Sequence, residues 1–313
     1  MTRDKTLWAL LAVTVLMLAA GLVLPEWAVF LLTLSLAKGL VVLGLLILWR
    51  TGLVSFGQAL FYGFGGYAVG LLGLATGISD IVVLSVVSII CAGLLAGLVG
   101  LLLARYRDIF FAMLSMAFSM ILYGILVKTE ALGSTDGFNV VTPTFLGATL
   151  EGPAQRMGMY VWVTVLCGIS AYGVHRYLSS TMGQLAAAIR DNEIRVEYLG
   201  VSVQRIILIK VVIAGALAGA GGAVTAFAVG HIDPDAMAYW TVSGEFVFVT
   251  ILSGTGSVFA PFLGSLLFEL IRTYAFEYSP YTWQLVLGGS LLLIILFLPN
   301  GLWSLVVRLG KRG

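Results

Sequence analysis

Charged side chains inside apolar sequence are the first candidates for chemistry in this chain. Lys38, Glu245 and Glu269 each lie within a long apolar run, and Arg272 follows Glu269 by one turn. Each must find a partner or water, because hydrocarbon solvates charge poorly. Glu269 and Arg272 are three residues apart and can pair on one helix, which would be a structural role. Lys38 has no acid nearby in the sequence, so we hypothesise a Lys38–Glu245 pair that lines a path for a zwitterionic solute.

A second group of polar side chains stands in a glycine-rich stretch, residues 52–70. If this stretch is helical, Ser55, Gln58 and Tyr62 fall near one face, because they are spaced three to four residues apart. That face could line a polar path, whereas the surrounding glycines are more typical of close helix packing. Ser253 is a weaker candidate for the same path, since hydroxyls in helices commonly bond back to the preceding turn.

The longest polar interruption of the chain, residues 179–206, is predicted to be a structured loop. Thr181 is followed three residues later by Gln184, which is the signature of a capping box and predicts that a helix starts there. Gly200 is a favourable residue for ending a helix. The loop therefore reads as one short amphipathic helix, or as a pair of helices.

This loop divides into an apolar stripe and a charged back. The stripe is formed by Leu185, Ala188, Ile189, Val196 and Leu199. On the charged side, Asp191 stands four residues before Arg195, the favoured order for an ion pair. Such a helix could lie on a membrane surface, or it could fit a groove on a cytoplasmic partner. The residues assigned to docking are Gln184, Ile189, Arg190, Asp191, Asn192, Glu193, Arg195, Leu199 and Gly200.

Several other classes of site are not predicted. The chain has no G-x-x-x-x-G-K-[ST] sequence, so it is not expected to cradle nucleotide phosphates in that way. Cys91 and Cys167 lie in apolar runs without disulfide or metal spacing. His231 near Asp233 and Asp235 is a weak metal signal, and the net charge of +2 does not indicate nucleic acid. We therefore expect no catalytic residue, no metal and no cofactor in this chain.

The composition predicts an all-α polytopic membrane protein that forms one transmembrane domain over residues 1–313. Hydrophobic residues make up 60% of the chain and charged residues only 10%, against about 25% charged residues in soluble domains. Apolar runs long enough to cross ~30 Å of hydrocarbon recur along the sequence. The predicted spans are 7–24, 27–48, 52–75, 81–104, 109–127, 159–178, 207–230, 240–253, 258–277 and 281–298. The eighth is too short for an ordinary span, so it is expected to be broken or re-entrant near residues 253–257.

Basic residues orient these ten spans. With both termini in the cytoplasm, the opposite face keeps only Lys128 and Arg156, as the positive-inside rule requires. The cytoplasmic basic residues are then Arg3, Lys5, Arg50, Arg105, Arg107, Arg176, Arg190, Arg195, Arg205, Arg308, Lys311 and Arg312. The polar loop 179–206 also falls on the cytoplasmic side, between the sixth and seventh spans.

Several stretches, in order along the chain, carry a resemblance to a known family. They are 52–68 (GLVSFGQALFYGFGGYA), 134–138 (STDGF), 183–194 (GQLAAAIRDNEI) with 199–201 (LGV), 253–257 (SGTGS) and 299–303 (PNGLW). Together they resemble the permease family typified by the LivM subunit of branched-chain amino acid ABC transporters. One departure is Ala260, where the family pattern leads us to expect glycine before Pro261.

The resemblance implies a permease subunit of an ATP-driven importer in the bacterial inner membrane. Its partners would be two cytoplasmic ATPase subunits that bind ATP and Mg, a second related permease, a periplasmic binding protein and membrane lipid. The loop 179–206 would be the coupling helix, and Asp136, Gly137 and Asn139 would help to dock the binding protein. Solutes carried by such permeases include branched-chain and other amino acids, urea and amides, and aromatic acids. The alternative is a self-contained secondary transporter or channel, which would also use broken helices.

Overall fold

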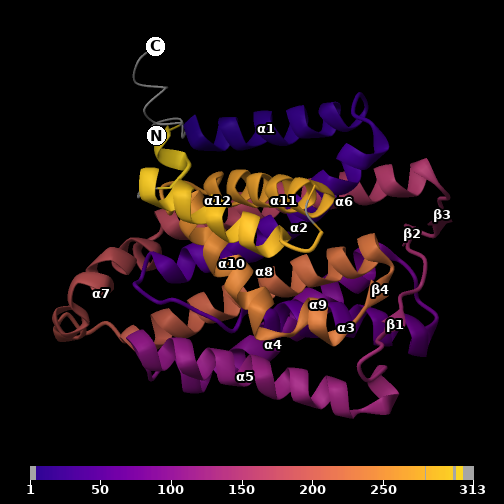
Figure 1. Ribbon diagram of the computed structural model, residues 1–313. Helices are drawn as coiled ribbons and strands as arrows, with labels where there is room; N and C mark the ends of the chain where they lie inside the picture. Colours follow the sequence, from indigo (N-terminus) through magenta and orange to yellow (C-terminus); the bar gives the residue numbers. More distant parts are fainter. Residues whose placement is uncertain (1–4, 279, 299–300, 306–313) are drawn as a thin grey trace.

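The computed structural model describes residues 5–278, 280–298 and 301–305, and most of them lie in α-helices. The long helices run roughly side by side, with α1 along one edge of the bundle and α5 along the opposite edge (Figure 1). The helices are α1 (Lys5–Gly21), α2 (Glu26–Trp49), α3 (Gln58–Thr76), α4 (Ile81–Leu103), α5 (Asp108–Lys128), α6 (Pro153–Ser179), α7 (Thr181–Tyr198), α8 (Val203–Val229), α9 (Pro234–Met237), α10 (Trp240–Ser253), α11 (Ala260–Tyr278) and α12 (Trp283–Phe297).

Seven of the described helical stretches are long and apolar enough to cross a membrane, which confirms a multi-pass membrane protein. The seven are α2, α3, α4, α5, α6, α8 and the combined stretch Pro234–Ser253. Helices α1 and α12 are shorter apolar helices, and α11 carries Glu269, Arg272 and Glu277 within its 19 residues. Each of the ten predicted spans therefore corresponds to a helix. Three of these helices, α1, α11 and α12, are too short or too charged to count among the seven. Of the basic residues used for orientation, Arg3, Arg308, Lys311 and Arg312 lie outside the described residues.

Helix α8 lies at the centre of the bundle and packs against α2, α3 and α4. Its small residues make this possible. A Cβ added to Gly219 would collide with the Ala92 side chain, and one added to Gly222 would meet the carbonyl oxygen of Tyr62. A Cβ added to Gly65, in the 52–70 stretch, would collide with the backbone of Gly219, which confirms the interpretation of this glycine as a packing position.

Two helices begin inside the bundle rather than at its ends. Residues 52–57 are not helical, so α3 starts at Gln58, and the expected helical span over 52–75 is wrong in its first six residues. Gly57 lies against Ser115, which is seven residues, or about 10 Å, inside α5. The hydroxyl of Ser115 accepts a hydrogen bond from the backbone N–H of Phe56. A side chain of another helix thus satisfies a backbone group freed by this break, as membrane depth requires.

The second break lies between α9 and α10, at Ala238 and Tyr239, just before the predicted eighth span. The sequence did not predict a break at this position. Ser119 of α5 donates a hydrogen bond to the carbonyl of Ala238. The chain also leaves helical geometry between α10 and α11, as the sequence predicts, with Gly254 at φ +79°.

One end of the bundle carries α7, and the other carries short strands that the all-α expectation missed (Figure 1). We call these the α7 end and the strand end. The strands are β1 (Phe138–Asn139), β2 (Thr144–Phe145), β3 (Ala148–Thr149) and β4 (His231–Ile232). β1 pairs antiparallel with β4, and β2 pairs antiparallel with β3. The first pairing ties the loop after α5 to the loop after α8.

Candidate functional site

Four charged side chains meet between α2, α10 and α11, and we call this set the charge network. Lys38 Nζ lies 2.5 Å from Glu269 Oε1 and 3.6 Å from Glu245 Oε2. Arg272 Nη1 lies 3.4 Å from Glu245 and 3.9 Å from Glu269. Both pairs anticipated from the sequence form, and the structure joins them into one network of two cations and two carboxylates. Lys38 lies near the middle of α2, and Glu269 lies near the middle of α11.

Burial within the charge network is uneven. The side chains of Lys38 and Glu269 are 12% and 8% exposed, whereas those of Glu245 and Arg272 are 27% and 38% exposed. Aromatic rings cover the two cations, with Phe268 next to Lys38 and Trp283 next to Arg272. Lys38 and Glu269 therefore form a closed pair, while Glu245 and Arg272 present the open side. Solute contact by Lys38 and Glu245 stays a prediction.

The other residues predicted to line the path do not share one face. Tyr62 of α3 is buried against Phe246, the neighbour of Glu245 in the sequence, with ring centroids 5.2 Å apart. Ser55 lies before α3 begins, so the predicted alignment of Ser55 with Gln58 and Tyr62 on one helical face is wrong. Its hydroxyl accepts from the N–H of Gly57 within the 52–57 segment. Ser253 bonds back to the carbonyl of Thr250, the structural role that hydroxyls commonly take.

Gln58 is the polar side chain whose surroundings are least complete. It is 1% exposed, yet neither its amide nitrogen nor its amide oxygen has a hydrogen-bond partner among the described residues. Leaving both groups buried and unpaired costs about 1–3 kcal/mol for each group. Gln58 begins α3 at the inner end of the 52–57 segment. A polar solute or water could supply the missing partners there.

The loop 179–206 is helical, as predicted, and consists of two helical segments. Asn192 has extended backbone at φ −164°, and its side chain caps the second segment by accepting from the N–H of Arg195. The helix starts at Thr181, as predicted, but its N-cap is Ser180 rather than Thr181, because the Ser180 hydroxyl accepts from the N–H of Gly183. Gly200, at φ +80°, ends the helix as predicted.

Helix α7 is attached to the bundle by apolar and charged contacts. Ile189 and Val196 are buried in the same apolar core as Leu53, whereas the predicted stripe members Ala188 and Leu199 are exposed. Gly183 and Ala186 are buried in their place. The break at Asn192 turns the second segment, so the predicted Asp191–Arg195 ion pair does not form among the described residues. Its place is taken by Arg107 at the start of α5, whose Nε lies 2.6 Å from Glu193 Oε2.

An exposed apolar patch covers the second segment of α7. Ile194, Tyr198 and Leu199 are 61%, 87% and 78% exposed. Only Leu199 was in the predicted docking set. The missed signal is the spacing of Ile194 and Tyr198, which are four residues apart and so lie on one helical face. Among the other predicted docking residues, Gln184, Arg190, Asp191 and Arg195 are exposed, while Ile189 is buried.

Lys210 is a further ionisable residue inside a predicted span, and it was not among the residues singled out from the sequence. This lysine of α8 is fully buried, and its ammonium donates to the hydroxyl of Thr51 at 2.6 Å. Among the described residues no carboxylate lies within ion-pair distance of it. The available signal was the apolar sequence around it, Ile206 to Ile213. Lys210 is as strong a candidate for a functional role as Lys38, because a charge inside the membrane is costly.

The three residues predicted for docking at the strand end have different environments. Gly137 lies where β1 begins, at φ +68°, and an added Cβ there would collide with the carbonyl oxygen of Ile232. Asn139 faces His231 across the strand pair, with Oδ1 3.0 Å from Nδ1. Asp136 is exposed. Gly137 and Asn139 therefore build the loop, and Asp136 is the one free to meet a partner.

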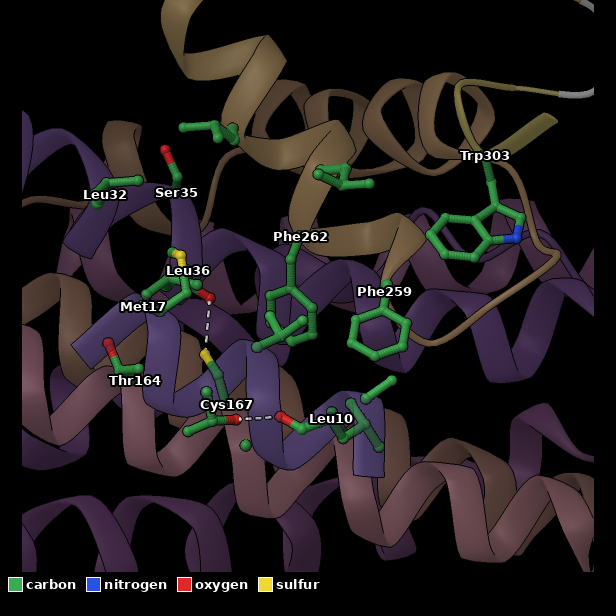
Figure 2. Close-up of a pocket in the computed structure, with 17 residues that line it drawn as sticks. Leu10, Met17, Leu32, Ser35, Leu36, Thr164, Cys167, Phe259, Phe262 and Trp303 are labelled. Atoms are coloured by element: carbon green, nitrogen blue, oxygen red, sulfur yellow. Dashed lines mark hydrogen bonds between the residues drawn. The ribbon is translucent and has the colours of Figure 1, made fainter. Parts of the chain in front are cut away.

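An apolar cavity of about 360 Å³ lies between α1, α2, α6 and α11, and none of the four residues of the charge network lines it. Figure 2 shows Phe259, Phe262 and Cys167 around it. Its hydroxyl groups are already occupied, since Thr14, Ser35 and Thr164 each donate to a carbonyl of their own helix. A cavity with this lining suits hydrocarbon and offers no partner to a polar solute.

Comparison with known proteins identifies the family. The permease component of branched-chain amino acid transport systems matches residues 27–296. The high-affinity branched-chain amino acid transport system permease protein LivM of Escherichia coli (strain K12) is 27% identical over 320 residues, 94% of this chain and 74% of the relative. The LivM protein of Salmonella typhimurium (strain LT2) is 27% identical over 317 residues, with the same two shares. No solved structure matches. The chain belongs to the family of permease components of branched-chain amino acid transport systems.

Proposed function

We propose that this chain is the permease subunit of an ATP-driven ABC importer in the bacterial inner membrane. It would carry branched-chain amino acids or related small polar solutes from a periplasmic binding protein to the cytoplasm. The observation that carries this proposal is α7, a helical element that is seated in the bundle on one side and presents the apolar patch Ile194, Tyr198 and Leu199 on the other.

The mechanical setting of α7 supports a coupling role. Its ends connect directly to α6 and α8, two long helices that run through the bundle. Contact with Arg107 and burial of Ile189 and Val196 hold it against the protein. A partner that grips the exposed patch can therefore move α6 and α8 together with α7. Coupling of this kind needs a packed bundle with two arrangements.

Charge supports placing the α7 end in the cytoplasm, where both termini are also proposed to lie. Arg50, Arg107 and Arg190 all lie at this end, where Arg107 pairs with Glu193 and Arg190 packs beside Gly52. At the strand end Arg156 is accompanied by Glu26, at 2.5 Å. Such a bias of basic residues marks the cytoplasmic side of a membrane protein.

The motor would reside in other subunits. The chain has no P-loop sequence, so ATP and Mg would be bound by two ATPase subunits, one of which would receive α7. A second related permease would complete the pore, and the exposed Asp136 would face the binding protein. In this arrangement the chain itself is a transport component and holds no cofactor.

The solute path is proposed to pass the open side of the charge network. Glu245 and Arg272 offer one charge of each sign, which suits the two ends of a zwitterion, and Lys38 holds Glu245 from behind. Gln58 would contact solute nearer the α7 end. Glu245→Gln should lower uptake of leucine, whereas unchanged uptake would remove Glu245 from the path.

The alternative, a secondary transporter, would need a carboxylate free to bind the coupling ion. Both carboxylates of the charge network already have cationic partners within 4 Å. Their pairing favours the ATP-driven importer. Transport of leucine by this chain alone in liposomes would favour the alternative.

Co-purification tests the proposed function. A chain with Ile194→Asp and Tyr198→Asp should lose its bound ATPase subunits and ATP-driven leucine uptake, because the charges disrupt an apolar contact. Leu146→Asp is the matched control, since Leu146 is 86% exposed at the strand end. Retention of ATPase and uptake by the α7 variant would contradict a docking role for the patch.

A further inference from the structure

A three-residue turn after α2 contacts three separate elements of the molecule. We call residues Arg50, Thr51 and Gly52 the linker turn. It stands at the α7 end and leads directly into the non-helical 52–57 segment and the start of α3. Each of its three residues makes a contact that is far away in the sequence.

The first contact joins the linker turn to α8. Lys210 is 0% exposed, and Thr51, which is 4% exposed, supplies its only hydrogen-bond partner among the described residues. An ammonium group has three donors, so this lysine is held by one neutral oxygen where it could use three acceptors. A buried charge with so few partners is costly, and an arrangement that brings it further acceptors would be stabilised.

The second contact joins the linker turn to α7. Gly52 has φ +82°, and a Cβ added there would lie 2.9 Å from Cγ of Arg190. The stem of Arg190 therefore lies directly on the backbone of the linker turn. Arg190 belongs to the first segment of α7, whose Ile189 is buried beside it. Movement of α7 must displace this backbone or lose the contact, because packed atoms cannot overlap.

The third contact joins the linker turn to the connection between α10 and α11. Both Nε and Nη2 of Arg50 donate to the carbonyl oxygen of Thr255, at 3.0 and 2.7 Å. Burial lowers the pKa of the Arg50 guanidinium, which nevertheless stays charged as arginine does in proteins. Helices α10 and α11 carry Glu245, Glu269 and Arg272.

The segment that follows the linker turn reaches the unsatisfied Gln58. Side chains of two other helices hold the backbone on either side of Gln58. The Ser115 hydroxyl of α5 accepts a hydrogen bond from the N–H of Phe56, and the Ser243 hydroxyl of α10 accepts one from the N–H of Ala59 in α3. A shift of the linker turn would therefore change the position of Gln58 relative to α5 and α10.

We propose that the linker turn transmits the motion of α7 to the 52–57 segment, which acts as the gate of the solute path at the α7 end, and that the Thr51–Lys210 hydrogen bond latches the gate in this arrangement. Thr51 and Lys210 are positioning residues that act through the backbone and do not touch solute. This inference rests on the proposed function, because it takes α7 as the element that the ATPase moves.

The test compares two substitutions of Thr51 in the complete transporter. Thr51→Val removes the hydroxyl at nearly constant volume, and Thr51→Ser keeps it. The complex with its ATPase and permease partners is placed in proteoliposomes with the binding protein. Leucine transported and ATP hydrolysed are then measured together. We expect Thr51→Val to hydrolyse ATP while moving at least about fivefold less leucine per ATP, a typical size for allosteric coupling, and Thr51→Ser to match the wild type.

A second variant protects the test from a folding defect. Lys210→Met combined with Thr51→Val leaves no unpaired charge and still lacks the latch, so it should assemble and show the same loss of coupling. A wild-type leucine-to-ATP ratio in both hydroxyl-less variants would overturn the latch and leave the proposed function intact. Absence of ATP-dependent uptake of leucine and of the related small polar solutes by the wild-type complex would overturn the proposed function, and the latch with it.

Discussion

Two lysines lie inside the helical bundle, and the protein holds them in different ways. Lys38 is placed between two carboxylates, at 2.5 Å and 3.6 Å, in a network that links α2, α10 and α11. Lys210 has one hydroxyl at 2.6 Å, supplied by a turn outside any helix. The Lys38 ammonium has two carboxylate partners, so this site should stay fixed when the protein changes conformation. The Lys210 ammonium depends on a single hydrogen bond, so this site is suited to a segment that moves.

The largest loss of stability should come from removing a carboxylate that pairs with Lys38. Glu269→Ala should destabilise the protein by about 3–5 kcal/mol, because it removes the closest partner of a buried cation. Glu26→Ala is the matched control, since its pair with Arg156 is more than half exposed and should contribute only about 0–1 kcal/mol. Unfolding of the purified chain in detergent, followed by circular dichroism, measures both. Equal losses would mean that the charge network is as dispensable as a surface pair.

A smaller loss of stability is expected at the Lys210 site. Thr51→Val should cost about 1–3 kcal/mol, because the Lys210 ammonium then stays buried without its hydrogen bond. Thr51→Ser should be nearly neutral in the same unfolding measurement. If the Thr51→Val and Thr51→Ser variants are equally stable, Lys210 has other hydrogen-bond partners, and its contrast with Lys38 disappears.

The smallest effect concerns the backbone of the linker turn. Gly52 and Gly77 have nearly the same left-handed geometry, at φ +82° and +71°, but only Gly52 has a side chain in the way of a Cβ. Gly77→Ala should cost about 1 kcal/mol for backbone strain alone. Gly52→Ala should cost more, because it must also move Arg190. A Gly52 variant no less stable than the Gly77 variant would show that Arg190 does not bear on the turn.

The sequence predicted the helical elements well, because long apolar runs with few charges have few other solutions in a membrane. It also predicted that the chain leaves helical geometry between α10 and α11, whereas the break before α10 was not predicted. It placed the start of the third span wrongly, because apolar composition cannot distinguish a helix from a non-helical segment that is satisfied by Ser115 of another helix.

Long-range pairing was the harder part of the site. Lys38 and Glu269 are 231 positions apart, so pattern alone suggested the local pairing of Glu269 with Arg272. The sequence allowed either one helix or a pair of helices over 179–206, but it did not indicate that the break falls at Asn192. The bond between Lys210 and Thr51 was hidden in the same way, because the two residues are 159 positions apart.

Labelling of α7 from the two sides of the membrane tests the central claim most directly. Tyr198, at 87% exposed, is replaced by cysteine in a chain carrying Cys91→Ser and Cys167→Ser, and a membrane-impermeant maleimide is applied to spheroplasts and to inverted vesicles. We predict labelling only in inverted vesicles, with protection when the ATPase subunits are bound. Labelling from the outside of spheroplasts would contradict the cytoplasmic position of α7 and the coupling mechanism that depends on it.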